Sequence, residues 1–227
     1  MSKTELIPLG MGIVSSFLVR AEGNVLIDTG YPGSEKKIRR QLGKLGVQVG
    51  DIDLIVITHG HTDHFGSLPA IKAASNAKVA VHALEADAVR TGINMPVVPT
   101  SRMGRLIAKM ATDTIPGYSS VEPDIIIDGD TFSLKDFGVD ATILHTPGHT
   151  PGSLSIMLPE GETIVGDLIF GGFIFKKRPQ MPFIAMNLQR VKESINYLLS
   201  RSPSLFYVSH GGPFSVESVK KLLTRFP

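Results

Sequence analysis

The stretch ITHGHTDHFG, residues 57–66, is the most informative part of the chain. It follows the apolar run Leu54–Ile57, which predicts a buried strand, and the residues from His64 onward predict a helix. The polar residues therefore fall on a turn at the carboxyl end of a strand, where open α/β sheets place their ligand sites. Imidazoles and a carboxylate this close together suit Zn²⁺ or a similar first-row ion better than Mg²⁺ or Ca²⁺. The side chains that predict this site are His59, His61, Asp63 and His64.

Three further candidate ligands, His149, Asp167 and His210, also lie just past apolar runs. Gly148 allows a sharp backbone turn directly before His149. Because every candidate follows the end of a predicted strand, we expect all of them to converge on one cleft. The strands in question are predicted at 141–144, 162–165 and 205–208.

Alternating apolar residues and turn signals predict strands followed by helices in both halves of the chain. This order is compatible with two sheets packed face to face with helices outside. Other strands are predicted at 6–9, 16–20, 24–27, 51–57, 78–81, 125–127, 131–134 and 153–158. Helices are predicted at 34–45, 65–74, 84–91, 103–111, 188–200 and 216–225.

Taken together, the motifs resemble those of the metallo-β-lactamase-fold hydrolases. The resemblance rests on H-x-H-x-D-H after a hydrophobic strand, the early Asp28-Thr29-Gly30, the run TPGHT at 146–150, Gly166-Asp167 and the late Ser209-His210-Gly211. It extends from about the first strand to the last few residues. It implies an α/β fold, a four-layer αββα sandwich, in a single domain over residues 1–227 with an insertion at about 92–122.

The resemblance also implies a dinuclear hydrolase. It assigns one ion to His59, His61 and His149, a second to Asp63, His64 and His210, and the bridge to Asp167; Asp63 and Asp167 are the implied catalytic residues. Zn²⁺ is favoured, and Fe or Mn would suit the same donors. A metal-bound hydroxide would attack an ester, thioester or lactone carbonyl. A phosphodiesterase or nuclease of the same fold is the alternative, and a diiron redox module is a further one.

The residues after Asp167 carry expectations about the substrate. Phe170 and Lys176 match two offsets typical of glyoxalase II-type relatives, and Arg178 follows, so all three are candidate substrate-binding residues. A cation here would hold a substrate carboxylate, whereas the alternative is a basic surface loop. Lactonases of the fold have Tyr at the place of Phe170, which disfavours a lactone. The chain continues for 17 residues after His210, so no counterpart of the glutathione-binding extension is expected.

Two irregular segments are predicted to form an apolar wall over the metals. The insertion at 92–122 is rich in proline, methionine and basic residues, and it is interpreted either as a lid or as a packed connection. The segment 170–183 is unusually apolar for a loop and is interpreted as an acyl pocket or a dimer contact.

Three other polar residues have roles that the sequence leaves open. Asp28 is interpreted either as a hydrogen-bond acceptor for the metal turn or as a cap for the loop before the next helix. His82 ends a strand without a carboxylate companion and is interpreted as a packed or surface histidine. His145 does not match the motif and is interpreted as structural or at the edge of the site.

Composition excludes several classes of protein. A formal net charge of +2, with the charges scattered, does not favour nucleic acid, and the absence of cysteine excludes disulfides and thiolate ligands. The start of the chain does not resemble a signal peptide and no apolar run is long enough to span a membrane. We therefore expect a cytoplasmic enzyme with a small-molecule substrate, no membrane association and possible homodimerisation.

Overall fold

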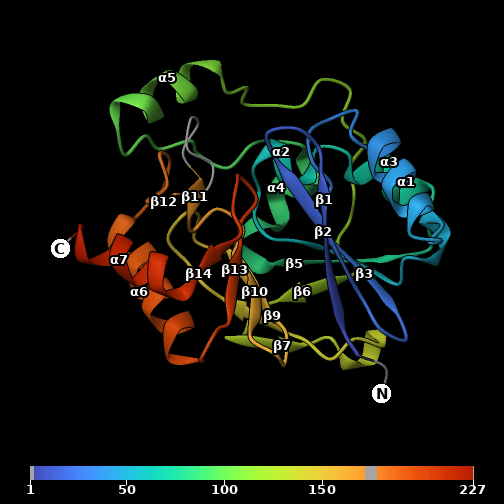
Figure 1. Ribbon diagram of the computed structural model, residues 1–227. Helices are drawn as coiled ribbons and strands as arrows, with labels where there is room; N and C mark the ends of the chain where they lie inside the picture. The colour runs from blue at the N-terminus through green and yellow to red at the C-terminus, as the bar shows by residue number, and fades with distance from the viewer. Residues whose placement is uncertain (1–2, 172–177, 227) are drawn as a thin grey trace.

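Two six-stranded sheets lie face to face, with helices on both outer faces (Figure 1). The computed structural model describes residues 3–171 and 178–226. The first sheet has the order β1 (Glu5–Gly10), β2 (Ser15–Arg20), β3 (Asn24–Ile27), β4 (Leu54–Ile57), β5 (Lys78–His82), β6 (Ile125–Ile127). The second has the order β14 (Phe214–Ser215), β13 (Leu205–Tyr207), β10 (Glu162–Ile164), β9 (Leu154–Met157), β8 (Thr142–His145), β7 (Thr131–Ser133).

The burial of β4 explains why its sequence is an unbroken apolar run. It pairs in parallel with β3 and with β5, and all four of its residues are buried. Ile55 and Ile57 pack toward the outer helices, whereas Leu54 and Val56 pack toward the second sheet. A strand covered on both faces needs apolar residues at every position.

Three apolar layers hold the sandwich together. One lies between the first sheet and α1 (Glu35–Lys44), α3 (Leu68–Ala73) and α4 (Ala86–Thr91); one lies between the sheets; and one lies between the second sheet and α6 (Leu188–Ser200) and α7 (Val216–Thr224). This arrangement confirms the predicted four-layer αββα architecture. None of the helices in the described ranges combines the length and the apolar character that crossing a bilayer requires.

The helix predicted at 65–74 is broken in the structure. It forms two short helices, α2 (Thr62–Phe65) and α3, separated by Gly66 and Ser67. Pro69 lies in the first turn of α3 and has no amide to continue a helix from Phe65. A Cβ at Gly66 would meet Pro32 and the carbonyl of Thr62, so the backbone passes through a space that only glycine fits.

Three strands were not predicted: β11 (Phe170–Gly171), β12 (Pro179–Gln180) and β14. Each has two residues, which is too short to show an alternating pattern. The first two pair with each other, and residues 172–177 in the connection between them lie outside the described ranges.

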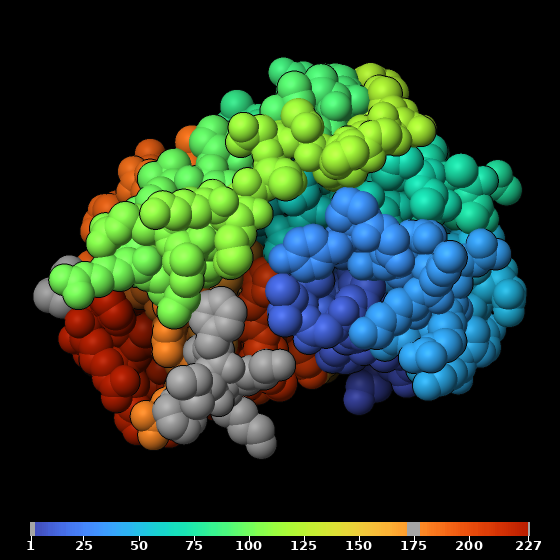
Figure 2. Space-filling model, turned by 90° about the horizontal axis from the view of Figure 1, so that it is seen from above, coloured from blue at the N-terminus to red at the C-terminus, as the bar shows by residue number. Residues whose placement is uncertain are grey.

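The insertion at 92–122 belongs to the first half of the chain but packs against residues of the second half. Its helix α5 (Arg102–Met110) lies above β11 and β12 in Figure 1. The amide of Thr100 donates to the carbonyl of Phe183 at 2.9 Å. The amide of Ala185 donates to the carbonyl of Val98 at 2.9 Å. Figure 2 shows a hollow bordered by this green segment and the blue N-terminal part of the chain. The insertion is therefore tied by backbone hydrogen bonds to the second half of the chain.

Candidate metal centre

The predicted ligands meet at one edge of the two sheets. His59, His61, Asp63 and His64 lie on the turn after β4 and in α2, and His149 lies on the loop between β8 and β9. Asp167 follows β10 and His210 follows β13, and these two strands are parallel neighbours. Their carboxyl ends therefore open at the same edge, which brings both side chains to the turn after β4.

The first trio of ligand atoms belongs to His59, His61 and His149. His149 Nε2 lies 3.1 Å from His59 Nε2 and 2.9 Å from His61 Nδ1. Nitrogens held about 2.0–2.1 Å from one tetrahedral ion are roughly 3.3 Å apart. All three side chains are buried, so the trio has the spacing and the dry surroundings of a metal site.

A second trio, Asp63, His64 and His210, lies beside the first. His210 Nε2 is 3.2 Å from Asp63 Oδ2, and His64 Nε2 is 3.8 Å from the same oxygen. Asp167 lies between the trios: its Oδ2 is 3.6 Å from His149 Nε2 and 3.5 Å from His210 Nε2. The central carboxylate thus faces both groups of ligands.

Two buried polar atoms test whether cations fit here. His64 Nε2 and Asp167 Oδ1 make no hydrogen bond with any described residue, and they face each other at 3.5 Å. Buried polar atoms without a partner are rare because their desolvation is costly. A cation between them would satisfy both, so the residues present fit divalent metal ions.

The outer nitrogens of four imidazoles are held by hydrogen bonds. His149 Nδ1 lies 2.8 Å from the carbonyl of Ile184, and His210 Nδ1 lies 2.8 Å from that of Ile13. A carbonyl only accepts, so Nδ1 donates in both rings and the lone pair on Nε2 faces the cluster. His59 contacts Thr58 Oγ1 in the same way at 3.0 Å. In His61, by contrast, Nδ1 faces the cluster.

Asp28 supports the fourth imidazole and the turn itself. Its Oδ2 lies 2.8 Å from His64 Nδ1, and its Oδ1 accepts from the amide of Thr58 at 2.8 Å. The residue is fully buried and has a φ of 60°, a left-handed conformation that is uncommon outside glycine. Of its two predicted roles, the structure confirms the hydrogen-bond acceptor for the metal turn.

The histidines of the two trios have pKa values shifted in opposite directions. Burial lowers the pKa of His59, of His149 and, to about 3, of His61, so these three rings offer neutral lone pairs. Burial would also lower the pKa of His210, but the charge of Asp167 raises it to about 10. His64 has a raised pKa because Asp167 and Asp63 outweigh burial. A cation in the second trio would replace these protons, so binding releases them.

A cavity of about 590 Å³ opens onto the cluster. Among the described residues that line it, the charged groups are Asp63 and Asp167, beside His61, His149 and His210. The insertion and the described residues Phe170 and Phe183 both contribute apolar lining, which agrees with the predicted wall. The described apolar side chains of the lining are Ile13, Pro32, Val97, Ile107, Met110, Ala111, Ile115, Pro116, Phe170, Phe183 and Ile184.

The predicted substrate-binding residues have different positions. Phe170 lines the cavity and stacks on His210, with ring centroids 4.9 Å apart and an interplanar angle of 12°. Arg178 is exposed and does not belong to the lining. Lys176 lies outside the described residues.

Two residues near the cluster were not predicted. Tyr31 lines the cavity, and burial followed by the charge of Asp63 raises its pKa. Its position directly after Asp28-Thr29-Gly30 could have indicated that it lies near the metal site. Glu85 is fully buried and accepts hydrogen bonds from the amides of Gly60 and Gly152. Nothing in the local pattern around it marks it as unusual.

His82 and His145 form a stacked pair behind the His149 loop. Their ring centroids are 4.1 Å apart, and His145 Nε2 lies 2.8 Å from the carbonyl of Pro151. Neither belongs to a ligand trio, which agrees with their predicted structural roles.

Comparison with known proteins gives the class to which this fold and site correspond. The sequence model of one protein family, the metallo-beta-lactamase superfamily, matches residues 9–210. The chain belongs to this family. It is accordingly a metal-dependent hydrolase of the superfamily.

Individual relatives are distant. A probable metallo-hydrolase of Methanocaldococcus jannaschii is 32% identical over 156 residues, which are 69% of this chain and 67% of that protein. A human acyl-coenzyme A thioesterase is 30% identical over 135 residues, or 56% of this chain and 44% of that one. Among solved structures, the Rm3 metallo-beta-lactamase has a TM-score of 0.64 at 27% identity and covers 90% of this chain and 74% of its own.

Proposed function

We propose that the protein is a dinuclear hydrolase that cleaves an ester, thioester or lactone bearing an apolar acyl group. The observation that carries this proposal is the convergence of two ligand trios and Asp167 at the floor of a cavity with apolar walls. His59, His61 and His149 would hold one ion; Asp63, His64 and His210 would hold the other; and Asp167 would lie between them. Zn²⁺ suits this mixture of nitrogen and oxygen donors.

The residues around the cluster have distinct roles in this proposal. Two divalent ions, when bound, supply Lewis acidity and lower the pKa of a coordinated water. Asp63 and Asp167 carry the negative charge that offsets two cations in a buried place. Phe170 and Phe183, whose ring centroids are 5.8 Å apart, cover one side and exclude water from the reacting carbonyl.

Two observations favour an acyl substrate over a phosphodiester. The cavity is lined by apolar side chains, and the described lining contains no lysine or arginine to recognise a phosphate. The partly related human thioesterase acts on acyl-coenzyme A, as its name states. Carbonyl compounds with an apolar acyl chain are therefore the substrates to test first.

A substrate panel tests the proposal. It contains acyl esters and acyl thioesters of increasing chain length, lactones, a chromogenic cephalosporin and a bis-aryl phosphodiester, all with zinc-loaded protein. Each buried methylene contributes about 0.8 kcal/mol, so kcat/KM should rise roughly fourfold per methylene until the cavity is full. Asp167→Ala should fold normally and lose this activity. Preference for the phosphodiester, or no gain with acyl length, contradicts the proposal.

A further inference from the structure

Glu85 is a buried acid outside both the ligand trios and the lining of the cavity. It ends the short turn Ala83–Glu85 after β5, and its side chain is 0% exposed. Oε2 accepts from the amide of Gly60 at 2.8 Å, and Oε1 accepts from the amide of Gly152 at 2.7 Å. Its hydrogen bonds are thus directed to two loops.

Those two loops carry the first ligand trio. Gly60 lies between His59 and His61, and Gly152 lies on the loop of His149. The amide of Gly60 belongs to the planar peptide unit that joins it to His59, so holding this nitrogen fixes the direction of the chain at His59. The carbonyl of Gly60 accepts from the amide of Met95 at 2.8 Å. Both peptide units around Gly60 are therefore held in place.

Two glycines let the backbone of both loops come close to the carboxylate. A Cβ at Gly60 would lie 2.9 Å from Oε2, and a Cβ at Gly152 would lie 2.8 Å from Oε1. Both backbones approach the acid more closely than a side chain would permit. Glu85 comes from the half of the molecule that carries the first sheet, whereas Gly152 lies between β8 and β9 of the second. The first trio likewise joins the two sheets, because His59 and His61 follow β4 and His149 lies between β8 and β9.

We propose that Glu85 is a positioning residue that sets the distance between the turn of His59 and His61 and the loop of His149, and thereby the affinity of this trio for its ion. The inference rests on the proposed function in one respect, namely that the trio binds a metal. Outer partners of metal ligands typically change metal affinity by 10- to 100-fold. Glu85 acts one step further out, through the backbone, so about 10-fold is expected.

Glu85→Gln provides the main test. The glutamine has the same shape, but one of its ends is a donor and cannot accept a hydrogen bond from an amide. Metal-free protein is titrated with Co²⁺ and with Zn²⁺ against a competing chelator, and the Co²⁺ absorption spectrum is recorded. One of the two ions should bind about 10-fold more weakly, with an altered spectrum, and the other should bind within about threefold of the wild type. The weakened ion should be the one that His149→Ala loses.

Asp124→Asn is the matched control. Asp124 accepts from the amide of Val79 at 2.8 Å and from Lys72 Nζ at 2.7 Å beside the first sheet, and none of its side-chain hydrogen bonds within the described residues reaches a ligand loop. Both metal affinities should remain unchanged in this variant, although it too removes a charge that accepts from the backbone. A loss of affinity equal to that of Glu85→Gln would overturn the inference.

The remaining outcomes separate the inference from the proposed function. If the wild type binds two ions and Glu85→Gln binds both equally well, the inference is wrong and the proposed function stands. A wild type that binds no metal overturns both. Glu85→Asp, which keeps the charge but is one methylene shorter, should also weaken the same ion while its metal-free form keeps a native circular dichroism spectrum. Unfolded metal-free chains in both variants would show a purely structural role and overturn the inference.

Discussion

Two buried acids, Asp28 and Glu85, support the metal turn from opposite sides, and only one of them was predictable. Asp28 ends a predicted strand within a recognisable motif, so its position suggested contact with the turn. Glu85 follows His82 and two apolar residues at an unremarkable helix start. Its burial depends on Gly60 and Gly152, and the second of these lies 67 residues further along the chain. A contact of that separation leaves no periodic signal.

At the same scale, the lowered pKa of His82 should make the stability of the fold depend on pH. Burial, followed by the neighbouring His145, lowers the pKa of His82 from 6.5 to about 4. Between these values the unfolded chain binds a proton at His82 and the folded chain does not, so the free energy of unfolding falls as the pH is lowered below 6.5. From pH 7 to pH 5 this single group should account for up to about 2 kcal/mol.

His82→Phe isolates that contribution, because the ring can still stack on His145 but does not titrate. Urea unfolding of the metal-free wild type and variant at pH 7 and pH 5 measures the difference. The wild type should lose more stability than the variant at the lower pH. Equal losses would show that His82 keeps its ordinary pKa in the folded protein.

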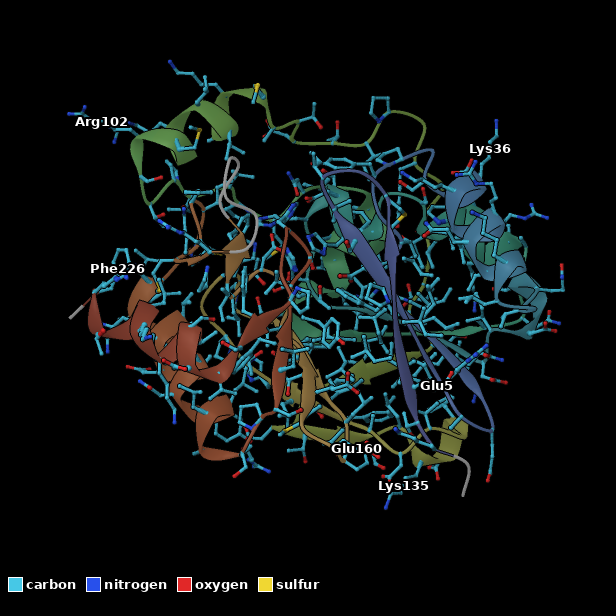
Figure 3. The ribbon with its side chains drawn as sticks, viewed as in Figure 1. Glu5, Lys36, Arg102, Lys135, Glu160 and Phe226 are labelled. Carbon is cyan, nitrogen blue, oxygen red and sulfur yellow. The ribbon has the colours of Figure 1, made fainter. Side chains whose placement is uncertain are left out.

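At the scale of elements, α5 and the segment that follows β12 form the wall of the cavity. Gly104 of α5 packs against the carbonyl of Phe183. On the same helix Ile107 faces the cavity, whereas Arg102 is exposed and points away from the body of the molecule (Figure 3). The helix was predicted with nearly correct bounds, but its position over the metal cluster depends on hydrogen bonds to the other half of the chain.

Ile107→Ser should therefore reduce the selectivity for long acyl groups. Loss of part of the apolar area of one isoleucine corresponds to about 1 kcal/mol, or roughly a fivefold lower kcat/KM for the longest acyl ester. The value for the acetyl ester should change little, because a short acyl group does not reach the helix. Arg102→Ala is the control, with both values unchanged. Equal loss for short and long esters would indicate damage to the metal centre instead.

At the scale of the whole molecule, the candidate metal centre joins the two halves of the sandwich. His59 and His61 come from the first half, and His149, Asp167 and His210 come from the second. Ions that bind only the folded chain stabilise it by about 4 kcal/mol when their concentration is 1,000 times the dissociation constant. Removal of metal should then lower the midpoint of thermal unfolding by roughly 8–16 °C.

Thermal unfolding followed by circular dichroism, with and without a strong chelator, measures this shift. Asp167→Ala lacks the central carboxylate and should respond much less to the chelator. A wild type whose midpoint does not change on chelation would show that the ions contribute nothing to holding the halves together.

The sequence was sufficient for the features that depend on local patterns. Apolar runs located β4 and most other strands, helical spacing located α6 at 188–200, and the recurrence of His and Asp after strands located the seven candidate ligands. Their assignment to two ions, and the single domain, stay predictions. Local patterns succeed here because a strand or helix buries one face with a fixed period, and that period is written in consecutive residues.

Contacts between distant segments could be seen only in the folded molecule. They set which nitrogen of each imidazole faces the cluster, because the carbonyls of Ile13 and Ile184 hold the outer nitrogens of His210 and His149. They also pack Gly66 against Pro32 and place α5 over the cavity. In each case the partner lies tens of residues away along the chain, and packing in three dimensions fixes the pair.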